Sequence, residues 1–370
     1  MQTSDLFHHF LAQLQPLLNA QQRYFSVALS GGVDSVVLLH LMSLARKQHP
    51  ELELEAVYVN HGLSEHAYEW QVFCKSLCEE LGVTFKALQV EIIERSRTSL
   101  EAQAREARYQ ALDEHCLVGS VILLGQHLND QLETFLLRLK RGSGLQGLAS
   151  MQQKRLLASG RVCFRPLIDI TREQIEQFAD EFAITHITDD SNVDERFDRN
   201  FLRHQVMPTL TERFQGFEKS AARSIRLLQQ QQSLLDEYTQ NDLANCQNKY
   251  KGLSCAAIAD FSKPRQANLV RAWLNQFTYQ LPSENQLQQI IEQGLTAKAD
   301  AQLKICLQSG DVRRHQQYLY FVTEQAIPQA MDIALQSVEL TDGRKLIVKA
   351  GKGVRKPQKD ERVRVEFNKP

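Results

Sequence analysis

Apolar and polar positions follow two different periods along the first 130 residues. Short apolar runs, typical of buried strands, occupy residues 25–29, 54–59, 84–90 and 121–124. Segments with helical spacing precede or separate them, at residues 6–18, 33–46, 67–81 and 99–116. Strands and helices that alternate in this way predict an α/β fold with a doubly wound, mostly parallel sheet.

The pattern changes in the second half of the chain. From residue 217 onward, apolar residues recur every three or four positions in a glutamine-rich segment, which predicts a linker helix over residues 216–248. Short helices at 265–277 and 284–293 and alternating strands at 303–307 and 318–322 are expected to follow. We therefore expect an α/β domain at 1–215, a small α+β domain at 249–325, and a basic segment at 326–370.

Three shorter segments carry local expectations. An extended segment is expected to begin at Arg165, and Thr171 to Gln174 looks like the capped start of a helix that runs to about Phe182. Residues 313–315, Arg-Arg-His, are expected in a hairpin turn, where they are either part of an RNA-binding face or simply solvated.

Composition adds few constraints. A chain of 370 residues is too long for one ordinary core, so two or three domains are expected. The net charge of −1 neither requires nor excludes a nucleic-acid partner, because the local distribution of Lys and Arg decides this. We find no apolar run of membrane-spanning length and no signal-peptide pattern, which predicts a cytoplasmic protein without a membrane partner.

Seven cysteines are scattered along the chain, and an odd number at such spacings argues against a disulfide framework. Cys74 and Cys78 lie four residues apart on a predicted helix, a spacing that a metal site or a redox pair could use. Because no second pair of ligands lies nearby, we interpret both as packed thiols on a helix face.

The first predicted strand runs into the loop Ser30-Gly31-Gly32-Val33-Asp34-Ser35, and a helix follows. Two glycines allow the backbone N–H groups to approach an anion closely, and the helix N-terminus favours a phosphate. The loop is neither GxxxxGK(S/T) nor GxGxxG, so the lysine of a kinase-type loop is missing. Such a site suits chemistry at an α-phosphate with pyrophosphate as the leaving group. A plain strand-to-helix turn capped by serines is the alternative.

Polar residues also follow the second and fourth predicted strands. Ligands of doubly wound sheets bind at the carboxyl ends of the strands, where His61 and the segment 125–134 are expected. His61 either caps a turn or contacts a nucleotide. Asp130 and Glu133 lie three residues apart at a helix start, so that both can share one face. They either complement the helix dipole or serve as magnesium ligands or amine-orienting carboxylates beside ATP.

Arginines and amides gather in two further places. Arg141 ends a predicted helix and precedes the glycine-rich segment 142–148. Arg196, Arg199, Asn200 and Arg203 follow the acidic turn at residues 189–192. A solvated, salt-bridged loop would explain the second group, but guanidinium and amide groups at this spacing also suit RNA phosphates and unstacked bases.

Seven blocks of the chain, taken in order, resemble the bacterial tRNA(Ile)-lysidine synthetases, a branch of the PP-loop ATP pyrophosphatases. These blocks are residues 30–35, Val59-Asn60-His61-Gly62-Leu63, 101–109, 127–134, Arg141-Gly142-Ser143-Gly144, Arg165-Pro166-Leu167, and 190–192 with Arg199-Asn200. The SGGxDS loop alone marks the wider PP-loop group, whereas the later blocks narrow the resemblance to this family.

The resemblance implies a reaction with ATP and Mg²⁺ as cofactors, and with free L-lysine and a CAU-anticodon tRNA(Ile) as partners. The wobble cytidine is adenylated at its C2 oxygen, and the lysine ε-amine then displaces AMP. By position, the resemblance implies that Ser30, Gly31, Gly32, Val33, Asp34, Ser35, His61 and His127 bind ATP, and that Asp34 and Asp130 hold the metal. Catalysis would then fall to Asp34, Asp130 and Glu133, and tRNA binding to Arg141, Arg196, Arg199, Asn200 and Arg203.

Two positions depart from the family pattern. Asn129 stands where a second aspartate is common, and Ser64 stands where arginine is frequent. Larger family members continue beyond residue 326 into a domain that grips the tRNA acceptor end, so the basic segment is expected to begin an incomplete third domain. Alternatives to the ligase are another PP-loop tRNA-modifying enzyme such as a thiolase, and a tRNA-binding relative with reduced activity. A homodimer is left open.

Overall fold

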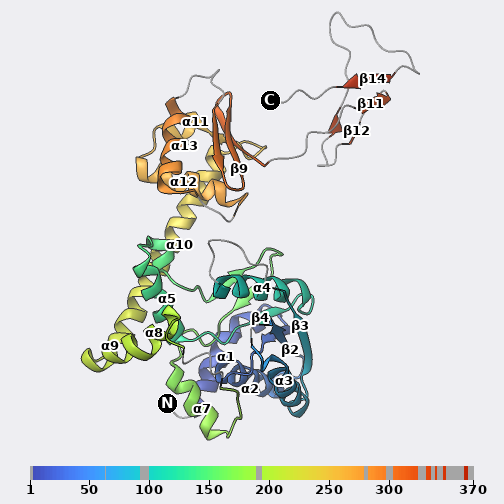
Figure 1. Ribbon diagram of the computed structural model, residues 1–370, viewed down its shortest axis with the longest axis vertical. Helices are drawn as coiled ribbons and strands as arrows, with labels where there is room; N and C mark the ends of the chain where they lie inside the picture. Colours follow the sequence, from blue (N-terminus) through green and yellow to red (C-terminus); the bar gives the residue numbers. More distant parts are fainter. Residues whose placement is uncertain are drawn as a thin grey trace, which may run out of the picture. The chain divides into compact units, whose positions relative to one another are not determined.

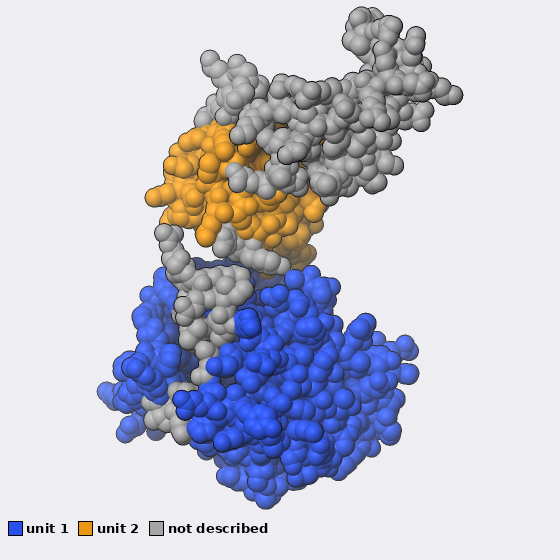
Figure 2. All heavy atoms as spheres, turned by 45° about the vertical axis from the view of Figure 1, so that its right-hand side comes forward, with its two compact units in different colours: residues 1–235 blue, residues 236–370 orange. Residues whose placement is uncertain are grey.

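The computed structural model describes residues 3–62, 64–91, 100–188, 194–278, 282–296 and 303–323, with four short strands beyond residue 330. The chain divides into two compact units, residues 1–235 and 236–370, which are coloured separately in Figure 2. The acidic turn at 189–192 and most of the basic C-terminal segment lie outside the described residues.

A six-stranded sheet forms the centre of the first unit (Figure 1). Its order is β3-β2-β1-β4-β6-β5, and every neighbouring pair is parallel except β5 with β6. The strands are β1 (Tyr24–Ala28), β2 (Glu53–Asn60), β3 (Thr84–Gln89), β4 (Val121–Leu123), β5 (Lys154–Leu156) and β6 (Val162–Phe164). The predicted doubly wound, mostly parallel sheet is thereby confirmed.

Helices cover both faces of this sheet, as alternating strand residues require. On one face lie α1 (Thr3–Asn19), α2 (Val33–Gln48), α3 (Ala67–Glu80) and α7 (Arg172–Glu181), around a core that includes Phe10, Phe25 and Leu39. On the other face lies α4 (Leu100–His115), where Leu112 packs with Ile122 and Cys163. Neighbouring β4 residues alternate between these cores, because successive side chains of a strand point to opposite faces.

The extended segment that was predicted to begin at Arg165 lies before this residue in the structure. The strand β6 ends at Phe164, and residues 165–170 form turns in which the N–H of Ile170 donates to the carbonyl of Leu167 at 2.9 Å. Pro166 explains the difference, since a proline lacks the N–H that a central strand would need. The capped helix start is confirmed, because the N–H of Thr171 donates to the side chain of Gln174 at 2.9 Å.

A helical layer completes the first unit beside the carboxyl end of β4. It consists of α5 (Leu128–Lys140), the short α6 (Leu145–Leu148), α8 (Asp198–Phe201), a π-helical turn (Leu202–Val206), α9 (Met207–Arg213) and the start of α10 (Phe217–Cys246). Leu128, Leu132, Met207 and Ile225 form its apolar centre. Isolated π turns are uncommon and often mark functional positions.

The second unit contains a four-stranded antiparallel sheet of order β7-β10-β9-β8. Its strands are β7 (Leu253–Ser254), β8 (Lys304–Leu307), β9 (Gly310–His315) and β10 (Tyr318–Val322), and its helices are α11 (Cys255–Ala259), α12 (Lys263–Asn275) and α13 (Glu284–Thr296). Trp273, Ile290 and Leu319 lie in its core. The predicted hairpin turn at 313–315 is wrong, because these residues are the end of β9 and pair with β10.

Two pairs of short strands lie beyond this sheet. The strand β11 (Met331–Ala334) pairs with β14 (Arg362–Val365), and β12 (Val338–Glu339) pairs with β13 (Lys345–Leu346), both antiparallel. Among the helices in the described part of the chain, we find none with the length and apolar character to cross a membrane.

Candidate active site

The glycine loop lies at the carboxyl end of β1, and hydrogen bonds of its own serine side chains stabilise its conformation. The Ser35 hydroxyl accepts from the N–H of Ser30 at 3.1 Å and donates to the carbonyl of Gly32 at 2.9 Å. Gly32 is the N-cap of α2, so the amides of Val33 and Asp34 fall in the first turn, where N–H groups have no intrahelical acceptor. The loop therefore presents donors and a helix N-terminus to an anion.

Gly31 and Gly32 are expected to differ in their tolerance of alanine. Gly31 has φ of +90°, and an added Cβ would lie 2.5 Å from Cδ1 of Ile187, whereas Gly32 has φ of −69° and its nearest atom would be at 3.8 Å. We expect Gly31→Ala to destabilise the fold by about 1–3 kcal/mol, because the backbone is strained and the contact is too close. Gly32→Ala is the matched control. Urea unfolding of both variants checks this, and equal stabilities would contradict it.

The loop after β4 brings His127 and Asp130 to the start of α2. Gly125 permits this approach, because a Cβ there would lie 3.0 Å from the backbone carbonyl of Asp34. The buried His127 ring places Nε2 at 3.6 Å from Oδ1 of Asp34 and 3.5 Å from Oδ2 of Asp130. Asp130 is the third residue of α5 and accepts the N–H of His127 at 3.1 Å, as an N-terminal carboxylate does.

Asp34 has a partner that the sequence did not suggest. Nη1 of Arg172, in the first turn of α7, donates to Oδ2 of Asp34 at 2.6 Å, although the two residues are 138 positions apart. The N–H of Arg172 donates to Oδ1 of Asn129 at 2.9 Å. Asn129 thus orients the start of α7, the helix that carries Arg172. An amide oxygen suits this role as well as the carboxylate of the expected aspartate would.

Glu133 is almost fully buried, with 1% of its side chain exposed, and lies between two arginines. Nε of Arg203 lies 2.7 Å from Oε1 of Glu133, and Nε of Arg199 lies 3.1 Å from Oε2. Nη2 of Arg203 also lies 3.4 Å from Oδ1 of Asp130. Two arginines predicted to bind tRNA are therefore brought together with the predicted catalytic carboxylates, on the α8 and π-helical segment.

The carboxyl groups at this site differ in their pKa values. Burial raises the pKa of Asp34 and outweighs the charges of His127 and Arg172. Burial also raises the pKa of Glu133, against the hydrogen bond from Arg203. Burial acts in the same direction on Asp130, but the charges of His127 and Arg199 prevail, and its pKa lies below the ordinary value. Asp130 is thus the carboxylate most firmly held in its ionised form.

The carboxylates fit a magnesium ion. Within the described residues, Oδ1 of Asp34 is buried and accepts no hydrogen bond, which leaves a hard oxygen ligand available beside Asp130. No cluster of three or more His, Cys, Asp or Glu side chains suited to a metal occurs in that same part of the chain. Mg²⁺ needs no such cage, because it binds through one or two carboxylates, waters and substrate phosphates.

The remaining predicted site residues lie in different settings. His61 follows β2, the neighbour of β1 in the sheet, and is half-buried. Asn200 is buried, and its Nδ2 donates to the carbonyl of Asp194 at 3.0 Å. Arg141 is exposed at the end of α5. Arg196 is also exposed and forms an ion pair with Asp194 at 2.7 Å.

Three arginines beside the site, Arg105, Arg108 and Arg165, were not predicted to be functional, although all three belong to the blocks that carry the resemblance. Arg165 is 2% exposed and donates to the hydroxyl of Tyr109 at 3.1 Å. Arg105 lies 5.5 Å from the centre of the Tyr109 ring, and burial together with nearby Arg108 and Arg199 lowers its pKa. This concentration of positive charge suits a polyanionic substrate. The signal was the spacing of Arg105, Arg108 and Tyr109 on one helix.

The cysteines are packed rather than reactive, as predicted for Cys74 and Cys78. Burial raises the pKa of Cys74, Cys78 and Cys116 to about 12, and only Cys306 is exposed among the seven. We expect iodoacetamide at pH 8 to modify the native protein once, at Cys306, because a buried thiol is both protonated and inaccessible. Mass spectrometry of the labelled protein checks this, with urea-unfolded protein as the fully labelled control. Native labelling of Cys74 would contradict it.

Family models match both units of the chain. Residues 6–210 match the model described as a PP-loop domain, and residues 253–320 match the model described as a TilS substrate binding domain. Among solved structures, the U34-tRNA thiolase NcsA of Methanococcus maripaludis has a similar fold, with a TM-score of 0.51 and 18% identity over 61% of this chain and 79% of that chain. The sheet, the glycine loop and these matches define a PP-loop protein that uses ATP.

Curated relatives narrow the class further. The chain is 42% identical to the tRNA(Ile)-lysidine synthase of Vibrio parahaemolyticus over 300 residues. The matched region covers 81% of this chain and 68% of that protein. It is 39% identical to the Shigella flexneri synthase, over 94% and 81% of the two chains, and 38% identical to the Vibrio cholerae synthase, over 98% and 83%. The chain belongs to the tRNA(Ile)-lysidine synthase family, which confirms the predicted family and the prediction of an enzyme.

Proposed function

We propose that this protein attaches free L-lysine to C2 of the wobble cytidine of a CAU-anticodon tRNA(Ile), with ATP as the second substrate. One observation carries the proposal. The glycine loop and the carboxylates Asp34 and Asp130 converge at one sheet edge, in a chain about 40% identical to proteins named for lysidine synthesis. The carboxyl ends of β1 and β4 are where a doubly wound sheet binds its ligands.

The first step is an adenylation. The C2 oxygen of the cytidine attacks the α-phosphorus of ATP, the bond to the bridging oxygen breaks, and pyrophosphate leaves. Donors of the Ser30 to Ser35 loop and the N-terminus of α2 stabilise the charge on that leaving group. Asp34 and Asp130 would hold Mg²⁺, which supplies charge neutralisation on the phosphates when bound. Arg172 keeps the Asp34 carboxylate in place.

The second step is an aminolysis. The ε-nitrogen of lysine attacks C2, the bond from C2 to the adenylate oxygen breaks, and AMP leaves with the oxygen. A lysine ammonium must lose a proton before it attacks, and Glu133, whose pKa is raised, is suited to orient the amine or accept that proton. Arg199 and Arg203 hold the two carboxylate oxygens of Glu133 in place. No protein nucleophile is required, because lysine itself attacks.

The tRNA is proposed to contact both units. Arg141 and Arg196 are exposed and available to phosphates, whereas Asn200, Arg199 and Arg203 shape the site from within. We assign residues 1–215 to catalysis, 216–248 to the linker helix and 249–325 to tRNA binding, and residues 326–370 form the basic C-terminal segment. The reaction is assigned to the cytoplasm, and the homodimer stays a prediction.

The test is a lysine-incorporation assay. The full chain is incubated with ATP, Mg²⁺, radiolabelled lysine and unmodified CAU-anticodon tRNA(Ile), and acid-precipitable label and AMP are counted. We expect lysine in the RNA with one AMP released for each lysine incorporated. A tRNA with a CAU anticodon but a methionine-specific body serves as the control substrate. Sulfur-dependent modification would favour a thiolase, and tRNA binding without AMP release would favour a relative with reduced activity.

A further inference from the structure

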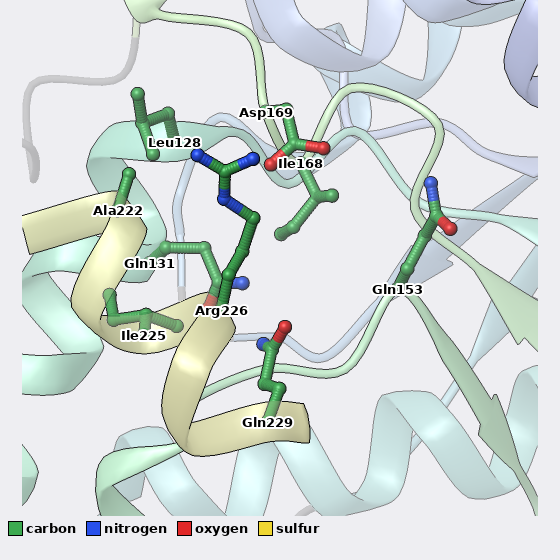
Figure 3. A pocket seen from close by; sticks show the side chains of 9 residues that line it. All are labelled: Leu128, Gln131, Gln153, Ile168, Asp169, Ala222, Ile225, Arg226 and Gln229. Carbon is green, nitrogen blue, oxygen red and sulfur yellow. The ribbon is translucent and has the colours of Figure 1, made fainter. Parts of the chain in front are cut away.

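A pocket of about 130 Å³ lies on the side of α5 that faces α10, within the first unit (Figure 3). Leu128 and Gln131 line it from α5, Ile168 and Asp169 from the turn after β6, and Ile225 with its neighbours from α10. The pocket is smaller than the roughly 300–1,000 Å³ of sites for drug-sized ligands. It therefore accommodates a single chemical group rather than a whole nucleotide.

The pocket has an apolar floor and a charged mouth. Leu128, Ile168 and Ile225 are buried, whereas Asp169 and Arg226 are exposed. In Figure 3 the guanidinium of Arg226 extends from α10 towards the carboxylate of Asp169. Within the described residues, neither side chain has a hydrogen-bond or ion-pair partner. An acceptor and a cation are thus available at the mouth of a hydrophobic slot.

Hydrogen bonds fix the wall of this pocket. Gln131 exchanges two bonds with the backbone of Met151, at 2.7 and 2.8 Å, and Gln229 donates to the carbonyls of Ala149 and Met151, both at 3.0 Å. Both amide side chains are therefore held by the same loop. A wall fixed in this way favours a preformed site, because little side-chain freedom is lost when a group enters.

A basic stripe adjoins the pocket on α10, formed by Lys219, Arg223 and Arg226. These residues follow at spacings of four and three, which places them on one face of the helix over about 10 Å. All three are exposed, and in the described part of the chain none has an ion-pair partner. The opposite face of α10 packs against α5 and α9 through Phe217, Ala221 and Ile225. Within the described residues, the stripe therefore presents three cations without ion-pair partners to solvent.

We propose that the stripe binds phosphates of the RNA substrate and that the pocket receives one unstacked base of the same RNA segment. This inference rests on the proposed function. A row of three unpaired cations suits a phosphate backbone. An apolar slot with a carboxylate at its mouth suits a base that carries an exocyclic amino group. The size of the pocket fits the base alone and leaves its phosphate outside, where Arg226 lies.

The phosphate contact is tested by salt dependence. The affinity of the full chain for tRNA is measured between 50 and about 300 mM KCl for wild type and for Lys219→Gln/Arg223→Gln/Arg226→Gln. Each lost phosphate contact is expected to lower the slope of log K against log salt by about 0.7–0.9, so by about 2–3 in all. The control replaces the exposed Arg23, Lys47 and Lys75 by Gln. A slope unchanged in the stripe variant would overturn the proposal.

The base contact is tested by a double-mutant cycle. Each anticodon-loop base of the tRNA is replaced in turn by an abasic site, and each substrate is bound to wild type and to Asp169→Asn. At one position we expect the effects of base removal and of Asp169→Asn on tRNA affinity to be non-additive by at least about threefold. This is near the lower end of the coupling found between groups in contact. The control is Asp180→Asn, an exposed acid on α7.

Other outcomes separate this inference from the function on which it rests. If no abasic position couples to Asp169, the pocket holds no base and the proposal fails, even if the wild type incorporates lysine. If Asp169→Asn raises the KM for lysine and leaves tRNA affinity unchanged, the pocket binds the free amino acid and the proposal fails as well. Absence of lysine incorporation by the wild type would instead contradict the proposed function.

Discussion

Replacing Asp130 by alanine is expected to abolish AMP formation while tRNA binding stays nearly unchanged. Asp130 caps the start of α5, holds the His127 ring at 3.5 Å and contacts Arg203 at 3.4 Å. Removing it leaves the His127 ring, Arg203 and the phosphates of ATP without the carboxylate that organises them. Loss of one such electrostatic group at a reacting centre costs about 10²–10³ in rate, and loss of a metal ligand adds to this.

Two variants make this expectation specific. Asp130→Asn keeps an acceptor for the N–H of His127 but removes the charge, so it separates the cap from the chemistry. Glu212→Ala removes an exposed carboxylate of α9 and is expected to behave as wild type. Single-turnover formation of labelled AMP and filter binding of tRNA are the two measurements. Turnover of Asp130→Ala within tenfold of wild type would refute the assignment of this residue.

Replacing Arg203 by methionine is expected to destabilise the protein as well as to inactivate it. Glu133 is 1% exposed and takes a bidentate contact from Arg203 at 2.7 and 3.1 Å. Without this partner a buried carboxylate keeps only Arg199, at 3.1 Å. Breaking a buried pair costs about 3–5 kcal/mol, and because Arg199 remains we expect about 2–3 kcal/mol in the free energy of unfolding.

A double-mutant cycle separates stability from catalysis here. Glu133→Leu added to Arg203→Met is expected to restore much of the stability, because no buried charge is left unpaired, but to leave the enzyme inactive. Arg196→Met is the matched control, since this arginine is exposed and its loss is expected to leave unfolding unchanged. Urea unfolding measures the wild type, the single variants Arg203→Met and Glu133→Leu, the double variant and the Arg196→Met control. An Arg203→Met variant as stable as wild type would contradict the buried ion pair.

The succession of strands and helices along the chain and the place of the glycine loop could be predicted because both are local. Apolar runs predicted β1 to β4, and the alternation of strands with helices predicted parallel pairing. The short β5 and β6 could not be found in this way, because three residues carry too little periodicity and β5 is exposed. The second half of β9 was mistaken for a hairpin turn, because the polar run at residues 313–315 shows no apolar alternation.

The carboxylates and the arginines of the site were found as separate groups, and only the structure joined them. Asp34 and Arg172 are 138 residues apart, and Glu133 and Arg203 are 70 apart. No local sequence pattern predicts such pairs, because each ion pair depends on how α5, α7 and the π-helical turn pack against one another. The family resemblance implied that Arg199 and Arg203 bind tRNA, whereas in the structure both contact Glu133.

The fate of the α-phosphate gives the most direct test of tRNA adenylation at this site. The full chain is incubated with ATP labelled at the α-phosphorus, Mg²⁺ and CAU-anticodon tRNA(Ile) in the absence of lysine, and the RNA is then separated from free nucleotide. We predict label attached to the RNA, and its quantitative release as AMP when unlabelled lysine is added. Label that never enters the RNA, although lysine is incorporated when present, would contradict an adenylated intermediate.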